Sequence, residues 1–463
     1  MKTTKPKAAA AARIGAALGR RKRAELLELL RPCFARTEPW LQAGKYAAAV
    51  MCDLRRRNGW TIAERSGDRT PDRTQRLLNR AVWDTWAAMG VVRRFAVAGL
   101  DEAAVKSGRR RGLAVGAVDE TGQVKQGDCT AGVKRQYLGC AGKVANGINT
   151  VHLSYVREGT GHALIGAREW IPAGHIHDPV TSAVMGLPEN LAFRTKGQLA
   201  IAILTEAFAD GVRLDFVCGD EVYGACTELR EYLEDHDQAY VLRVPSSFRL
   251  MLAGRVTLTC QQAAARLGRR GWEVRSAGAG SKGQRWYAWA WLATASPRHH
   301  LLIRRHLQTG ELAFHYSYLP EGQPAAPSRP VRAAGLRWPA EEDFEVGKDC
   351  FGLDQSQVRL YTAIARHTVL VMAALAICAV TAALLRHRTG TQPPAPVHPD
   401  QPPPADRGMI PLTVPETGRL LSHPPPPGSA GHWLDWRRRH QACSRWYHQR
   451  TRLARRVEIA LVR

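Results

Sequence analysis

The chain has 463 residues and a formal net charge of +25, because 66 Lys and Arg residues outnumber 41 Asp and Glu residues. Its ten cysteines are scattered singly, so their spacing matches neither a zinc ribbon nor a disulfide framework. A charge of this size favours a polyanionic partner such as nucleic acid, with a basic but otherwise ordinary globular protein as the alternative.

The N-terminus begins like a secretion signal, but Arg13 interrupts its apolar part and GRRKR stands in place of a cleavage site. These features argue against secretion. The expected location is the cytoplasm, in association with the nucleoid.

Residues 1–100 are predicted to form a helical DNA-binding domain. Leucines recur at helical spacing in AELLELLRPCF, and Thr70 followed by Pro71 is typical of a helix start. A short helix and a turn in GWTIAERSGDR precede this start, so the pair is interpreted as a helix-turn-helix that meets the major groove; a solvated helix face is the alternative. The arginines placed for DNA contact are Arg69, Arg73 and Arg76.

Residues 101–245 change to an α/β pattern. The strand-like segments LAVGAVD, NTVHLSYV and GHALIGA are followed by a helix, a strand, a second helix and a strand, which indicates one sheet. Asp119 is expected to end the first strand and Asp220 the fourth. Chemistry concentrates at such strand ends, although an acid there can also be the first solvated residue of a turn.

The rest of the chain divides by composition. Residues 246–330 carry alternating aromatic segments such as RWYAWAWLATA, typical of a β-rich insertion, and residues 331–388 return to helix. The run TVLVMAALAICAVTAALL has the minimum length of a membrane span but is expected to be a buried core helix. The proline-rich residues 389–430 are predicted to be a linker that does not pack. Residues 431–463 form a basic, aromatic tail expected to bind nucleic-acid phosphates, with a solvated basic helix as the alternative.

One stretch, LRWPAEEDFEVGKDCFGLD, combines acids and bases at helical spacing. Arg337, Glu341 and Lys348 are four and seven residues apart and would share one helix face, whereas Glu342 points about a quarter-turn away. Pro339 fits only a first turn, so Arg337 is expected just outside the helix, near its N-terminus.

These three residues resemble the Arg-Glu-Lys part of the Tyr-Arg-Glu-Lys signature of insertion-sequence transposases with an Asp-Asp-Glu (DDE) triad. DETGQVKQG is similar to the family's motif at the first acid, RQYLGCAGKVAN to the segment that follows, and CGDEVYG to the strand end at the second acid. The chain departs from the pattern at Ala334, where the signature has Tyr, and at Glu120, where the first motif has a second Asp.

The resemblance implies an RNase H-like catalytic core with a β-rich insertion. It also implies that Asp119, Asp220 and Glu341 are catalytic and together hold two Mg²⁺ or Mn²⁺ ions. Three carboxylates at one point repel one another, and oxygen ligands select hard divalent cations. The residues expected to contact DNA near this site are Arg337, Lys348 and Lys125.

The expected function is a DNA transposase that binds terminal inverted repeats, cleaves DNA and joins the ends to a target. Its expected partners are double-stranded DNA and a second copy of the chain in a synaptic complex, with no membrane. One alternative is an RNase H-like nuclease without strand transfer. The other is a transposase-derived DNA-binding regulator without chemistry, against which the three intact acids weigh.

Overall fold

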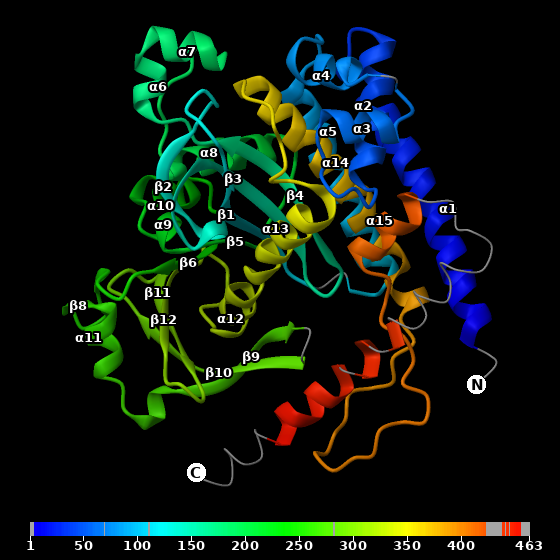
Figure 1. Ribbon diagram of the computed structural model, residues 1–463. Coiled ribbons are helices and arrows are strands. Elements are labelled where there is room, and N and C mark those ends of the chain that lie inside the picture. The colour runs from blue at the N-terminus through cyan, green and yellow to red at the C-terminus, as the bar shows by residue number, and fades with distance from the viewer. Residues whose placement is uncertain are drawn as a thin grey trace.

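The computed structural model describes residues 4–68, 70–109, 112–280, 283–422, 438–439, 441–443 and 445–454 (Figure 1). The strands are β1 (Ala114–Val124), β2 (Lys134–Leu138), β3 (Lys143–Arg157), β4 (Gly161–Glu169), β5 (Phe216–Gly219), β6 (Tyr240–Val244), β7 (Arg249–Met251), β8 (Thr257–Thr259), β9 (Glu273–Gly280), β10 (Gly283–Ala293), β11 (His299–His306) and β12 (Leu312–Tyr318).

The N-terminal half contributes α1 (Thr4–Leu30), α2 (Thr37–Val50), α3 (Gly59–Arg65), α4 (Asp72–Asn79), α5 (Thr85–Lys106), α6 (Ala173–His177), α7 (Pro179–Met185), α8 (Lys196–Ala209), α9 (Glu221–Gly224) and α10 (Thr227–Asp235). The later helices are α11 (Cys260–Ala265), α12 (Ser328–Gly335), α13 (Trp338–Phe351), α14 (Tyr361–Thr389) and α15 (Val414–Ser422). In Figure 1 the helices α1–α5 and the strands β9–β12 lie at opposite ends of the molecule, with α13 between them.

Within the described residues, ten strands form one mixed sheet in the order β2-β3-β1-β5-β6-β12-β11-β10-β9, with β4 paired to β3. The antiparallel strands β1, β3 and β4 form the expected meander, and β5 and β6 join it in parallel. The sequence predicts the succession of these five strands along the chain and their place in one sheet, but not β2, which pairs with β3. The first half of β1 is buried, as expected for a strand with neighbours on both sides.

The strand β1 is longer than predicted. It pairs with β3 along its whole length, to Val124, so the expectation that Asp119 ends the strand is wrong. What ends beside Asp119 is the pairing with β5, whose last pair joins Val118 to Gly219. The antiparallel neighbour β3 therefore keeps the chain extended where a turn was expected.

The segment expected to be a β-rich insertion is mostly β. Its strands do not form a sheet of their own: β12 pairs with β6, and β11, β10 and β9 extend the central sheet outward. A short two-stranded sheet, β7 with β8, lies outside this continuous sheet.

The helix α14 packs between β4 and the N-terminal helices α1, α2, α4 and α5. It is long and apolar enough to cross a membrane, but its most apolar window is entirely buried inside the protein. The helices α5 and α14 meet at Gly99, where a Cβ atom would lie 2.5 Å from Val380 Cγ1. The apolar run is thus a core element in this structure.

The proline-rich segment packs more than predicted. Met409 and Leu412 are buried, and α15 lies against α1 and α14. Leu412 and Leu420 form a small apolar cluster with Ala16 and Leu385. The few apolar residues between the prolines cover the end of α14. The average composition of the segment does not predict this packing.

Candidate active site

Two strands place Asp119 and Asp220 side by side. Val118 of β1 and Gly219 of β5 are the last pair of their parallel ladder, so the next residue on each strand is an aspartate. Neighbouring strands are about 5 Å apart, which brings the two acids to one edge of the sheet. Asp220 also caps α9, where its Oδ1 accepts a hydrogen bond from the Val222 amide at 2.9 Å.

The first turn of α13 supplies the third acid. Arg337 stands at the N-cap, as predicted, and its Nη1 lies 2.6 Å from Asp119 Oδ2. Its Nη2 lies 3.4 Å from Glu341 Oε1, so one guanidinium bridges two acids from distant parts of the chain. The three acids singled out from the sequence therefore converge around Arg337.

The electrostatics of these acids reflect their crowding. Burial raises the pKa of Asp119 to about 7, against the opposing effect of Arg337 and with further increases from Glu341 and Asp220. Burial also raises the pKa of Asp220, and the charge of Glu120 adds to this effect. Such acids are stabilised as carboxylates only when positive charge lies close by.

A supporting network lies beside them. Glu120 Oε1 accepts a hydrogen bond from Lys196 Nζ at 2.5 Å, and its Oε2 accepts one from Tyr223 Oη at 2.7 Å. Lys196 begins α8 and Tyr223 lies in α9, so Glu120 joins both helices to β1. Sequence reasoning did not assign these partners to Glu120.

The donor set fits Mg²⁺ or Mn²⁺ by its chemistry, because each of the three acids offers carboxylate oxygens. As they stand, no three His, Cys, Asp or Glu side chains of the described residues are grouped to hold a metal ion. Arg337 contacts one carboxylate oxygen of Asp119 and one of Glu341. The acids thus lie close together, but their side chains are not arranged as a complete metal site.

The other two basic residues expected near the acids differ in their placement. Lys348 lies on α13, half-buried. Burial lowers the pKa of His152, the residue paired with Asp119 across β1 and β3, and the charge of Lys348 lowers it further. Lys125 is buried, and its Nζ donates to the Ser356 carbonyl oxygen at 2.6 Å. Because six residues of strand span about 20 Å, Lys125 lies far from Asp119. This placement corrects the expectation that Lys125 contacts DNA beside the acids.

An arginine-rich cavity adjoins the acids on the side of β9–β12. Its volume is about 440 Å³, and Arg337 belongs to its lining. The Nε atoms of Arg285 and Arg304 are buried there without a hydrogen-bond partner among the described residues. Ala334, in place of the signature tyrosine, also lines the cavity. The basic residues of the lining are Arg243, Arg285, Arg304, His315, Arg337 and Arg452.

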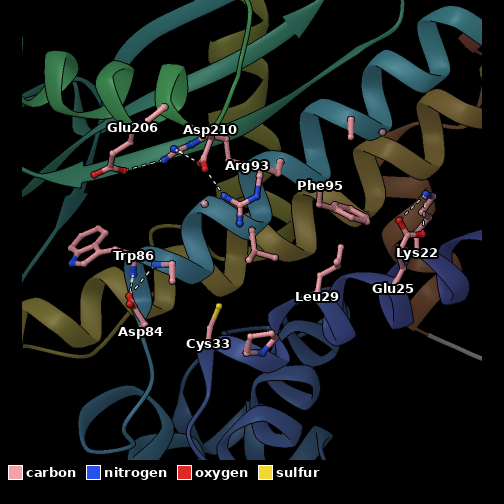
Figure 2. A pocket seen from close by; sticks show the side chains of 18 of the residues that line it. Lys22, Glu25, Leu29, Cys33, Asp84, Trp86, Arg93, Phe95, Glu206 and Asp210 are labelled. Carbon is pink, nitrogen blue, oxygen red and sulfur yellow. Dashed lines mark hydrogen bonds and ion pairs between the residues drawn. The ribbon is translucent and has the colours of Figure 1, made fainter.

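A second cavity, of about 840 Å³, lies between α1, α5 and the end of α8. Figure 2 shows its charged side chains joined to one another: Arg93 lies 3.1 Å from Glu206 and 2.7 Å from Asp210, and Lys22 lies 3.0 Å from Glu25. It adjoins the opposite end of α8 from Lys196, about 20 Å away along the helix. Its charged side chains are paired with one another, and its lining contains none of Asp119, Asp220 and Glu341.

The predicted DNA-binding elements are only partly described. Helices α3 and α4 occur where the helix-turn-helix was expected; Arg73 and Arg76 are exposed, and Arg69 lies outside the described residues. In the basic tail, residues 445–454 are helical, and Arg452 Nη1 donates to the Gln284 carbonyl oxygen at 2.9 Å. Arg452 therefore contacts the start of β10, whereas Arg445 and Arg450 contact the proline-rich segment at Gln392 and Pro399.

Comparison with known proteins identifies the family to which the chain belongs. A family model described as DDE superfamily endonuclease matches residues 29–302, more than half of the chain. The matched segment contains Asp119 and Asp220 and ends before Glu341. The solved structure of a piggyBac transposase synaptic complex with hairpin DNA is similar at a TM-score of 0.37 and 12% identity, covering 84% of this chain and 70% of that chain. A comparison with curated proteins found no match.

Proposed function

Because this chain belongs to the DDE superfamily endonucleases, we propose that it is a DNA transposase of the insertion-sequence kind, with an RNase H-like catalytic core. The observation that carries the proposal is the convergence of Asp119, Asp220 and Glu341 around one guanidinium. The single sheet that contains β4, β3, β1, β5 and β6 supports the core assignment, since the sequence predicts these strands in one sheet with helices between the later ones.

In this proposal the three acids hold two Mg²⁺ or Mn²⁺ ions. When bound, two such ions activate the attacking water or 3′-hydroxyl and stabilise the leaving oxygen of an in-line phosphodiester displacement. Asp119 and Asp220 are mounted on rigid strands, and Glu341 approaches from α13. Arg337 and Lys348 then contact the phosphate backbone beside the scissile bond.

The arginine-rich cavity supports a DNA substrate. Guanidinium groups bind phosphate oxygens through several donors at once, and buried donors without partners gain most from such a ligand. Arg285 and Arg304 have these properties, and they adjoin the acids through Arg337. We therefore assign the cavity to the DNA strand that is cut.

The remaining parts of the proposal concern partners. The helices α3 and α4 would read the terminal inverted repeats, and the basic tail would contact phosphates without sequence preference. Two ends must be processed together, so a homodimer is proposed for the synaptic complex. The proposed location is the cytoplasm, with the nucleoid.

A nuclease without strand transfer is the second candidate, favoured by the family description, which names an endonuclease. One assay separates the two: a supercoiled plasmid bearing the element's own ends is incubated with the full chain and Mg²⁺. Excised ends that are joined to a target support transposition. Cleavage without joining supports the nuclease.

Substitution of the acids tests the site in the same assay. Asp119→Asn, Asp220→Asn and Glu341→Gln should each bind the ends and lose cleavage by orders of magnitude, because each removes a charge needed to hold the ions. Glu345→Gln, on the exposed side of α13, is the matched control and should retain cleavage. Near-normal cleavage by Asp220→Asn, or metal-independent cleavage by the parent chain, would overturn the assignment.

A further inference from the structure

A histidine of the sheet contacts the helix that carries Glu341. His162, at the start of β4, lies with its Nδ1 2.8 Å from Asp343 Oδ1 and its Nε2 3.4 Å from Glu342 Oε2. Ser154 Oγ of β3 donates to the other oxygen of Asp343. The two residues that directly follow Glu341 are therefore both held by the β3–β4 hairpin.

The chemistry of this contact requires a cation. Both ring nitrogens of His162 face carboxylate oxygens, and both can donate only when the ring is protonated. Burial alone would lower the pKa of His162, but the charges and hydrogen bonds of Asp343 and Glu342 outweigh it and raise the pKa to about 10. The imidazolium thus joins α13 to β4 through two charged contacts at neutral pH.

These contacts constrain the rotation of α13 about its own axis, together with the packing of Phe344 against His152 and the ion pair of Arg337 with Asp119. Successive residues of a helix differ by 100°, so holding Glu342 and Asp343 sets the direction of Glu341. A rotation of about 20° would move a carboxylate about 5 Å from the axis by about 2 Å. That displacement is large compared with the tolerance of a metal ligand, which is a few tenths of an ångström.

We propose that His162 is a positioning residue, which holds α13 in the rotation that directs Glu341 toward Asp119 and Asp220. The inference rests on the proposed function, because it assumes that these acids hold divalent ions. The inference gives Glu342 and Asp343 a role as well. They are not proposed as metal ligands, but they hold the helix that carries Glu341 through their contacts with His162.

The test uses the full chain and measures Mn²⁺ binding by calorimetry, alongside Mg²⁺-dependent cleavage and thermal unfolding. His162→Gln can donate toward only one of the two carboxylates, and we expect it to weaken Mn²⁺ binding about tenfold or more, as loss of groups that orient metal ligands does. His162→Arg keeps a cation with donors for both carboxylates and should recover part of the affinity. DNA binding should be unchanged in both.

The matched control is His299→Gln, which breaks a histidine–carboxylate pair of the same kind, 3.0 Å from Glu234 on the far side of the sheet. It should lower thermal stability without changing Mn²⁺ affinity. If His162→Gln binds Mn²⁺ as tightly as the parent chain, the positioning role is wrong and the proposed function stands. If the parent chain shows no Mn²⁺ binding that Asp119→Asn removes, the proposed function fails, and the positioning role with it.

Discussion

At the scale of single residues, the guanidinium group of Arg337 contacts two acids, Asp119 and Glu341. Its ion pair with Asp119 is largely buried, with 21% of the arginine side chain and 10% of the aspartate side chain exposed. Removing one partner from such a pair leaves the other charge buried and costs about 3–5 kcal/mol, whereas removing both costs much less than the sum.

We therefore expect Arg337→Met to lower the free energy of unfolding by several kcal/mol in the parent chain, and by clearly less in the Asp119→Asn background. Denaturant unfolding of the four proteins of this double-mutant cycle measures the coupling. Strictly additive effects would show that Arg337 does not stabilise Asp119 in solution.

Motifs in the sequence indicate which distant residues come together, whereas contacts that only the fold creates cannot be predicted from it. Although their roles stay predictions, Asp119, Asp220, Glu341 and Arg337 lie close together, as the motifs indicate. Lys125 does not, because six residues along a strand that continues separate it from the acids. Nothing in the spacing of Arg285 and Arg304 indicates that β10 and β11 bring them to one cavity.

At the scale of elements, the crossing of α5 and α14 depends on a missing side chain. A Cβ atom at Gly99 would lie 2.5 Å and 2.6 Å from the two methyl carbons of Val380. Forcing extra atoms into a packed core costs about 1–3 kcal/mol. Alanine recovers about 1 kcal/mol of helix propensity, which offsets only part of this cost.

Gly99→Ala should therefore destabilise the protein, and Val380→Ala in the same chain should restore part of the loss by opening space. Gly174→Ala is the control: it lies in α6 with nothing within 4 Å of its Cβ position, and should be neutral or slightly stabilising. Thermal unfolding ranks the four proteins. Equal changes in thermal stability for Gly99→Ala and Gly174→Ala would contradict the close approach of the helices.

A buried histidine joins three elements and makes their packing sensitive to acid. Tyr46 Oη of α2 lies 2.8 Å from Nδ1 of His367, in α14, and His367 Nε2 lies 3.0 Å from the Gly352 carbonyl oxygen at the end of α13. Burial lowers the pKa of His367 to about 4. The unfolded chain binds a proton near pH 6.5, so the stabilising contribution of the neutral ring is complete above pH 6.5 and is lost as the pH falls toward 4.

The shift corresponds to about 3 kcal/mol across this range. His367→Gln keeps an acceptor and a donor but does not titrate, so its free energy of unfolding should fall less steeply between pH 6.5 and 4 than that of the parent chain. His387→Gln, exposed on the same helix, controls for the loss of one histidine. Parallel curves for the parent and His367→Gln would exclude this role of His367.

At the scale of the whole molecule, the N-terminal helices and the catalytic sheet share one core. Leu26, Leu77 and Leu100 of the helical part belong to the same apolar cluster as Val118 of β1 and Val371 of α14. Composition separates these regions at about residue 100, but it contains no information on whether two segments bury a common surface. For the same reason, composition cannot reveal that β12 continues the sheet at β6. A DNA-binding test should therefore use the full chain.

The last prediction concerns how the whole chain meets DNA. Arg73 and Arg76 are exposed on α4, and Arg73 lies 3.7 Å from the buried carboxylate of Asp68. Asp68 keeps its contact with Lys45 Nζ at 2.9 Å when Arg73 is replaced. Replacing both arginines with Gln should leave the fold intact. If α4 reads the terminal repeats, the double variant should lose affinity for repeat DNA more than for random duplexes, since contacts to base edges carry sequence information.

A salt titration separates recognition of the base sequence from electrostatic attraction to the phosphates. Each phosphate contact contributes about 0.9 to the slope of log K against log salt, so the loss of purely electrostatic contacts should lower the slope equally on repeat and random DNA. Arg80→Gln, exposed at the other end of α4, serves as the control with a lost charge but no expected loss of preference for the repeat. If the double variant retains the full ratio of repeat to random affinity, α4 does not read the sequence, and the specificity of the chain must be sought in another element.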